Sequence, residues 1–331
     1  MNSLSRRSGR QTAAGLGALT AIALGWGIQP AQAGYTIQDI VDPLNPTFTQ
    51  ALGINDAGTV VGYGNATTFN GFQLVPPAGF TRENFPGATG GTQVIGIDGA
   101  GDTVGFYVNP DGSTHGFFKP VAGAFQTVDQ SGSVFNQLLG INHSGNEIAG
   151  YSSFTDATGA TGQQAFSLSG GSYTNINALL PANANSQATG VNDAHSVVGF
   201  YMPTGATSTG FLDKGGVITN IDPFGSTFTQ ALGINDNGEI VGFETDAMGF
   251  QHGYVDINGV FTTFDPPDSA STTINGVNAA GQIVGFFTDN DTDSVVGFIA
   301  TPTATPEPAS LAILAVGLAG FGALRRRRKS A

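Results

Sequence analysis

A unit of about 43 residues recurs six times along this chain, and a repeat of that length restricts the fold more than local propensities do. Each copy has a nucleus that reads Gly, then Ile or Val, then Asn or Asp, then a short turn and an apolar segment. The nuclei begin at Gly53, Gly96, Gly140, Gly190, Gly233 and Gly276, at intervals of 43, 44, 50, 43 and 43 residues. Residues 47–56 and 227–236 share the sequence TFTQALGIND, an identity that chance does not produce.

Each unit is typical of four short strands. The first ends at the Gly-Ile-Asn of the nucleus, and the second is the Val60–Tyr63 type of segment. The Asn-Asp-x-Gly between them suits a tight hairpin turn with positive φ at Asn or Gly. A small residue followed by an aromatic, as at Gly71-Phe72, marks the third strand, and residues 125–129 represent the fourth. Four strands in about 43 residues is the period of a propeller blade, so the sequence predicts an all-β, six-bladed β-propeller over residues 34–300.

The two ends of the repeat region predict how the ring closes. The sixth copy ends after its third strand, near Ile299, whereas residues 35–42 form an extra fourth strand before the first copy. Asp42-Pro43 precedes its nucleus by 11 residues, and the fourth strands of two other copies end in Asp-Pro at that same distance. A linear stack would leave exposed strand edges at both ends. We therefore predict that residues 35–42 complete the sixth blade.

Residues 1–33 are typical of a secretory signal peptide. They contain a basic start, an apolar stretch over residues 13–28 and the small-x-small cleavage site Ala31-Gln32-Ala33. The well-placed cleavage site favours a removable peptide over the alternative, an N-terminal membrane anchor. The Arg6-Arg7 pair fits twin-arginine export, but Ser8 and Gly9 follow it where apolar residues usually strengthen that signal, so we expect the Sec machinery.

The last 26 residues contain a tripeptide, an apolar run and a basic cluster. In order, they are Pro306, Glu307 and Pro308, residues 309–324, and Arg325, Arg326, Arg327, Arg328 and Lys329. An apolar helix of 16 residues spans roughly 24 Å, the short edge of what crosses a bilayer core. The sequence thus predicts a linker over 301–308, a transmembrane helix over 309–324 and a basic cytoplasmic tail over 325–331.

This C-terminal order resembles the PEP-CTERM sorting tail of bacterial proteins that an exosortase anchors, cleaves and releases. The resemblance covers only these 26 residues, and it implies an exported protein of the cell envelope or surface, extracellular after processing. The alternative is a tail anchor that is never processed.

The third strands carry a second resemblance. Their tripeptides, which include His115-Gly116-Phe117, Gln164-Ala165-Phe166 and His252-Gly253-Tyr254, resemble those of the HAF-repeat family of bacterial extracellular proteins. The resemblance covers residues 35 to about 300. It implies an extracellular repeat protein and names no chemistry.

Charge and cysteine content exclude several classes of function. Residues 34–308 hold all 24 acidic residues and only three of the 11 basic residues. The formal charge of this stretch is therefore −21. Such a field repels nucleic acid and anionic lipid, so we expect no nucleic-acid partner and expect anionic polymers to bind only through bridging Ca²⁺. The chain has no cysteine, which excludes disulfides, thiolate catalysis and cysteine metal sites.

No catalytic or cofactor-binding set is apparent. His115 and His252 occupy one repeat position where other copies have Asn, Gln, Thr or Val, which indicates a structural or solvent-facing slot. There is no Gly-x-Ser-x-Gly elbow. A sialidase-like site needs several arginines, and Arg82 is the only arginine between the signal peptide and the C-terminal tail. Glycosidase chemistry needs two carboxylates, and no pair stands out among the acidic residues.

One acidic loop is a candidate metal site. Asp289, Asp291 and Asp293 alternate, and alternating carboxylates can converge on Ca²⁺. An EF-hand is excluded because Ser294 and Ala300 stand where it needs Gly and Glu. A looser calcium loop and a solvated acidic hairpin both remain. The recurring Asn-Asp pairs could suggest a ring of metal sites, but turn chemistry accounts for them more simply.

These observations predict a secreted or surface-anchored, non-enzymatic binding or matrix protein. Its expected partners are the Sec machinery, an exosortase, the membrane before processing, and extracellular polysaccharide. Among polysaccharides, neutral glycans could bind through exposed Tyr and Phe. A polysaccharide lyase or hydrolase on the same fold is the main alternative, and a calcium-dependent adhesin is the other.

Overall fold

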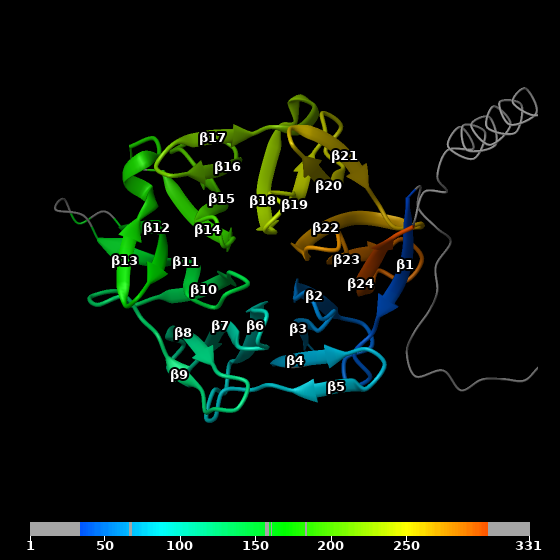
Figure 1. Cartoon of the computed structure of the whole chain (residues 1–331), viewed down its shortest axis with the longest axis horizontal. Coiled ribbons are helices and arrows are strands. Elements are labelled where there is room, and N and C mark those ends of the chain that lie inside the picture. Colours follow the sequence, from blue (N-terminus) through cyan, green and yellow to red (C-terminus); the bar gives the residue numbers. More distant parts are fainter. Residues whose placement is uncertain (1–33, 66–67, 156–158, 160, 183, 304–331) are drawn as a thin grey trace, which may run out of the picture.

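The computed structural model describes residues 34–65, 68–155, 159, 161–182 and 184–303. Six groups of four antiparallel strands stand around a central axis, with the first strand of each group innermost (Figure 1). The chain is therefore an all-β, six-bladed β-propeller, as predicted. A single parallel pair, Phe69 with Gly91, joins the first two blades into one continuous sheet.

Blades 1 to 5 are meanders of four consecutive strands. Blade 1 contains β2 (Thr49–Ile54), β3 (Val60–Asn65), β4 (Phe69–Val75) and β5 (Gly79–Arg82), and blade 2 contains β6 (Gly91–Ile97), β7 (Thr103–Val108), β8 (Thr114–Lys119) and β9 (Gln126–Thr127). Blade 3 contains β10 (Asn136–Ile141), β11 (Glu147–Thr155), β12 (Thr161–Ser169) and β13 (Ser172–Asn175), and blade 4 contains β14 (Asn185–Val191), β15 (Ser196–Met202), β16 (Thr209–Lys214) and β17 (Ile218–Ile221). Blade 5 contains β18 (Phe228–Ile234), β19 (Ile240–Thr245), β20 (Gln251–Ile257) and β21 (Val260–Phe264). The 3₁₀ turns η1 (Ile176–Leu179) and η2 (Pro223–Gly225) lie in connections between blades.

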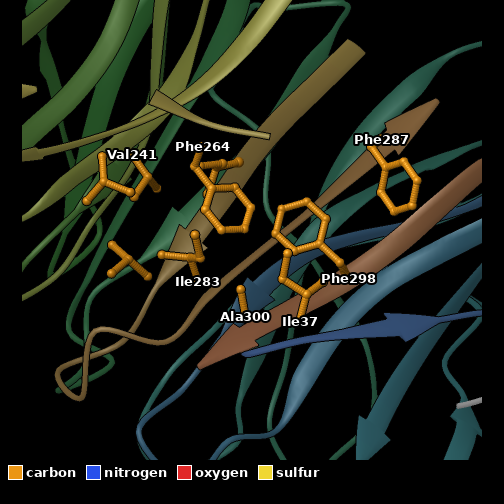
Figure 2. Packing of buried hydrophobic residues seen from close by; sticks show 10 residues of the cluster. Ile37, Val241, Phe264, Ile283, Phe287, Phe298 and Ala300 are labelled. Atoms are coloured by element: carbon orange, nitrogen blue, oxygen red, sulfur yellow. The ribbon is translucent and has the colours of Figure 1, made fainter. Parts of the chain in front are cut away.

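The first strand of the described chain completes the last blade. Blade 6 contains β22 (Ser269–Val277), β23 (Ile283–Asp289) and β24 (Val295–Pro302), and β1 (Tyr35–Ile40) pairs antiparallel with β24, from Tyr35 opposite Pro302 to Ile40 opposite Gly297. Ile37 of β1 is fully buried beside Phe298 and Ala300 of β24 and Phe264 of blade 5 (Figure 2). The predicted closure is therefore present. Both the pairing of β1 with β24 and the burial of Ile37 stabilise it.

The glycine that opens each nucleus lies where neighbouring blades approach most closely. A Cβ on Gly140 would lie 2.7 Å from the carbonyl oxygen of Thr189 and 2.9 Å from Cα of Gly190 in the next blade. A Cβ on Gly96 would likewise lie 3.2 Å from Cα of Gly140. Every nucleus glycine has such a contact, so the innermost strands can meet at the axis only because these side chains are absent.

The aromatic side chain of the third strand packs in the core of each blade, against the glycine of the second strand. A Cβ on Gly105 of β7 would lie 2.0 Å from the carbonyl oxygen of Gln93 and 2.9 Å from the ring of Phe117. The aromatics at this position are almost completely buried in every blade: Phe72, Phe117, Phe166, Phe211, Tyr254 and Phe298. The recurring third-strand aromatic is therefore a packing element, and the glycine of the second strand makes room for its ring.

The hairpin after each first strand has positive φ at its glycine in five blades and at His195 in blade 4. This agrees with the predicted turn, with glycine rather than asparagine in the left-handed region.

Several predicted segments lie outside the described residues. They are the signal peptide with its cleavage site, the Pro306-Glu307-Pro308 motif, the transmembrane helix over 309–324 and the basic tail. Within the described ranges, no helix has the length and apolar character needed to span a bilayer. The predicted linker starts later than expected, because β24 runs on to Pro302.

Candidate binding site at one mouth of the central channel

The central channel opens on one face of the ring into a cavity of about 530 Å³. One side chain from the innermost strand of each blade surrounds it, three positions before the nucleus glycine. We call this ring the glutamine mouth: Gln50, Gln93, Gln137, Gln187, Gln230 and Thr273. Because strand side chains alternate between faces, Gln50 and Leu52 face the channel while Ala51 between them is fully buried in the blade.

Aromatic side chains from the second strands form the wall of the cavity. They follow the strand-two glycine in five blades: Tyr63, Phe106, Phe200, Phe243 and Phe286. Burial raises the pKa of Tyr63 to about 12, so its phenol stays neutral at ordinary pH. In blade 3 the equivalent Tyr151 donates its hydroxyl to Oε1 of Gln137 at 2.8 Å.

Several polar groups of the cavity have no partner in the described part of the chain. Gln187 donates Nε2 to Oε1 of Gln163 at 3.0 Å, but Gln50, Gln93 and Gln230 make no side-chain hydrogen bond to another described residue. Oδ1 of Asn275, deeper in the cavity, is buried without a hydrogen-bond donor. No described residue that lines the cavity has a charged side chain. The mouth thus offers amide donors and acceptors beside aromatic rings.

The channel narrows below this cavity. Its waist is lined by the nucleus glycines and by the residues on either side of them, such as Leu52 and Ile54, around a space of about 70 Å³. A second small space of about 80 Å³ lies at the opposite face. A ligand of oligosaccharide size therefore has room at the glutamine mouth only, among the channel spaces of the described chain.

The opposite face carries a ring of asparagines with a structural role. We call it the asparagine mouth: Asn55, Asp98, Asn142, Asn192, Asn235 and Asn278. Asn192 donates Nδ2 to the carbonyl of Asn235 in the next blade at 3.0 Å, and Asn235 donates to Asn278 at 2.9 Å. Asn278 then donates to Asn55 at 3.1 Å, across the junction between the last blade and the first.

The other amide atom of these asparagines serves the turn. Oδ1 of Asn235 accepts the backbone N–H of Glu239 at 2.9 Å, which is the turn chemistry predicted for the Asn-Asp pairs. The bond between blades was not foreseen. The recurrence of Asn in five of the six nuclei could have indicated this bond. A turn alone also accepts Asp or Gly at that position, so this strict preference for Asn requires a further role.

The histidines lie in different blades and each contacts a carboxylate. Nδ1 of His115 is 2.7 Å from Oδ2 of Asp129, and Nδ1 of His252 is 2.7 Å from Oδ2 of Asp265. Burial opposes the charge on His252, but the hydrogen bond to Asp265 outweighs it, and the pKa of His252 is raised.

The other two histidines lie in turns after first strands. His143 approaches Asp56 at 3.4 Å, and His195 contacts Glu147 at 2.5 Å. The hydrogen bond to Glu147 raises the pKa of His195. No described histidine lines the glutamine mouth. Each of the four instead contacts an Asp or Glu side chain of the propeller.

The acidic loop after β23 uses one carboxylate to hold its own turn. Oδ1 of Asp289 accepts the backbone N–H of Thr292 at 2.8 Å and its hydroxyl at 2.7 Å, and the Thr292 hydrogen bonds lower the pKa of Asp289. Asp291 and Asp293 are exposed. Nowhere in the described ranges do three His, Asp or Glu side chains gather closely enough to hold a metal ion. Calcium binding by Asp289, Asp291 and Asp293 stays a prediction.

Comparison with known proteins identifies the tail. Residues 304–328 match the family model described as the PEP-CTERM protein-sorting motif. No curated protein sequence matches the chain. The resemblance of the repeats to the HAF-repeat family stays a prediction.

Several solved structures are similar in fold. The β-propeller domain of the Trilobed protease from Pyrococcus furiosus is 9% identical, with a TM-score of 0.47, over 79% of this chain and 100% of that one. The lectin of Aleuria aurantia, described as a six-bladed β-propeller, is 13% identical, with a TM-score of 0.46, over 79% of this chain and 96% of that one. TolB from Acinetobacter baumannii is 7% identical, with a TM-score of 0.46, over 75% of this chain and 64% of that one.

The sorting motif and the strand pairing together place the chain in a class. It is an extracellular β-propeller protein that carries a PEP-CTERM motif for sorting to the cell envelope or surface by an exosortase.

Proposed function

We propose that this chain is a non-enzymatic binding protein of the bacterial envelope or extracellular matrix, and that the glutamine mouth binds a segment of a neutral polysaccharide. The observation that carries the proposal is an uncharged cavity of amides and aromatic rings in a propeller, residues 34–303, whose formal charge is −20. Its volume of about 530 Å³ lies within the range of small-molecule sites, about 300–1,000 Å³.

The chemistry of the cavity suits sugar hydroxyls. A hydroxyl both donates and accepts, and so does a glutamine amide, so Gln50, Gln93 and Gln230 can each pair with one or two hydroxyls. Aromatic faces suit the apolar faces of a sugar ring without requiring charge. The surrounding negative charge disfavours acidic polymers, which leaves neutral glycans as the favoured class.

Asn275 adds a specific reason to expect a bound donor. A buried acceptor without a partner costs about 1–3 kcal/mol, and Oδ1 of Asn275 is such an atom at the inner end of the cavity. The atom is closed to a water-sized group, so a ligand hydroxyl would recover this free energy only after the Asn275 side chain rotated toward the cavity.

The same cavity supports binding over hydrolysis. Glycoside hydrolysis requires a pair of carboxylates about 5–10 Å apart, and no described residue that lines the mouth is acidic. Export through the Sec machinery, removal of residues 1–33 and exosortase cleavage near Pro306-Glu307-Pro308 complete the proposal. The sorting motif supports this route.

A polysaccharide screen tests the proposal. The chain is incubated with neutral and uronate-containing polysaccharides, with and without Ca²⁺, and retention and new reducing or unsaturated ends are both measured. We expect calcium-independent retention on a neutral polymer without new ends. New ends would instead support the lyase or hydrolase, retention lost in chelator would support the adhesin, and no retention on any neutral polymer would reject the proposed ligand.

A further inference from the structure

We infer that the asparagine mouth faces the membrane while the sorting tail is anchored, so that the glutamine mouth opens away from the lipid. The inference rests on the sorting route of the proposed function and on the transmembrane helix predicted over residues 309–324, which holds the tail in the membrane before exosortase cleavage. It does not depend on the ligand of the glutamine mouth.

The direction of the last strand determines where the chain leaves the propeller. At the start of β24, the backbone N–H of Val295 donates to the carbonyl of Thr47 at 3.0 Å, beside Gln50 of the glutamine mouth. At the end of β24, the hydroxyl of Thr301 accepts a hydrogen bond from Nε2 of Gln282 at 3.0 Å. Gln282 belongs to the turn that begins with Asn278 of the asparagine mouth. The strand therefore carries the chain from one face of the ring to the other.

The first described residue lies at the same place. The backbone N–H of Thr303 donates to the carbonyl of Gly34 at 2.8 Å, one residue beyond the pairing of Tyr35 with Pro302. Gly34 follows the predicted cleavage site, and the matched sorting motif begins at residue 304. Both targeting segments therefore join the propeller at the asparagine-mouth end of blade 6.

The length of chain between the propeller and the apolar run limits how the domain can turn. Five residues, 304–308, span at most about 18 Å even when fully extended. The eight residues of β24 span about 26 Å from one face to the other. Since the connection is shorter than the strand, it cannot bring the apolar run to the glutamine-mouth face. The membrane must therefore lie near the asparagine-mouth end of blade 6.

Exposure of the glutamine mouth to the outside follows from this orientation. A polymer outside the cell can reach this mouth without displacing the domain from the membrane. The asparagine mouth, where four of the five asparagine amides donate to the next blade, lies on the side toward the membrane. The propeller thus presents its uncharged cavity in the direction in which an extracellular partner would approach.

Two single-cysteine variants test the inference, and the natural absence of cysteine makes each label specific. Ala194 and Ala206 are both exposed and lie in the turns at opposite ends of β15, with Ala194 on the asparagine-mouth face. The seven residues of β15 separate them by about 23 Å. Ala194→Cys and Ala206→Cys therefore form a matched pair within one blade.

The full chain, purified from an expression host without an exosortase, is labelled with a fluorophore and reconstituted into phosphatidylcholine vesicles that carry a headgroup quencher. We expect the label at 194 to lose a larger fraction of its fluorescence than the label at 206. The same variants truncated after Thr303 serve as the control, and their two labels should be quenched equally.

Equal quenching of both labels in the reconstituted chain would indicate an edge-on domain and would overturn the inference, as would stronger quenching at 206. Failure of the full chain to float with vesicles would overturn it too, because the tail would then hold no face at a membrane. Loss of polysaccharide binding with asymmetric quenching retained would reject only the proposed ligand.

Discussion

The ion pair between Arg82 and Asp42 should be a main stabiliser of the closed ring. Asp42 follows the closing strand β1 and is fully buried, and Arg82 ends the fourth strand of blade 1. Nη1 of Arg82 donates to Oδ2 of Asp42 at 2.6 Å, and Nη2 donates to Oδ1. The pair therefore connects the last blade, which β1 completes, to the first.

Arg82→Gln removes the cation and leaves a buried carboxylate. Breaking a buried pair in this way typically costs about 3–5 kcal/mol. The Arg82 side chain is 27% exposed, so water can replace part of the interaction, and Asn45 still donates to Asp42 at 2.6 Å. We therefore expect a loss of about 2–3 kcal/mol. For a domain of this size that is a fall in Tm of about 5–10 °C, at roughly 2–4 °C for each kcal/mol.

Thermal unfolding of the domain over residues 34–303, followed by circular dichroism, measures this change. Lys214→Gln is the matched control, because Lys214 is exposed and makes no ion pair with another described residue. Its effect should stay within about 0.5 kcal/mol. Equal Tm values for the two variants would refute the role assigned to the Arg82 pair.

The pair also predicts a pH dependence. Burial alone would raise the pKa of Asp42, but hydrogen bonds from Arg82 and Asn45 more than offset burial and lower it. A carboxyl with a lowered folded pKa stabilises the fold above its unfolded pKa, near 3.9, and this stability is lost as the pH falls through the folded pKa. Arg82→Gln should therefore reduce the acid-induced loss of stability below about pH 4.

Three further changes should have measurable results. Gly140→Ala should lower Tm by several degrees, since overpacking costs about 1–3 kcal/mol and the new Cβ would meet backbone of the next blade; an unchanged Tm would contradict the close approach at the axis. The NMR titration of His252 should give a pKa above its ordinary value, which Asp265→Asn lowers; no change in that variant would exclude the assigned hydrogen bond. If the loop at 289–293 binds calcium, Ca²⁺ should raise Tm and Asp291→Asn should abolish the rise; a Tm independent of Ca²⁺ would reject the calcium loop.

Repetition made the architecture predictable. The nucleus spacing gave the number of blades, and the Asp-Pro spacing identified the closing strand, because both features depend only on comparing one copy with another. The end of β24 at Pro302 was missed by two residues. Its last residues pair with β1 from the other end of the chain, which the sixth copy alone could not indicate.

The site depended on the direction of side chains, which spacing does not determine. Gln recurs three residues before the nucleus glycine in five copies, but either face of an innermost strand could have lined the channel. The bonds between neighbouring asparagines and the Arg82–Asp42 pair were missed for a related reason. They join residues about 40 or more positions apart, and only the closed ring brings them together.

Calorimetric titration with the neutral polysaccharide fragment found in the screen measures whether the glutamine mouth binds it. The double variant Gln93→Ala/Gln230→Ala removes two amides that lack partners in the described chain, and Gln126→Ala, on the exposed strand β9, is the control. Each lost hydrogen bond is worth about 0.5–1.5 kcal/mol, so we expect the double variant to lose affinity by about fivefold or more and the control to lose none. Unchanged affinity in the double variant would show that the glutamine mouth is not the binding site.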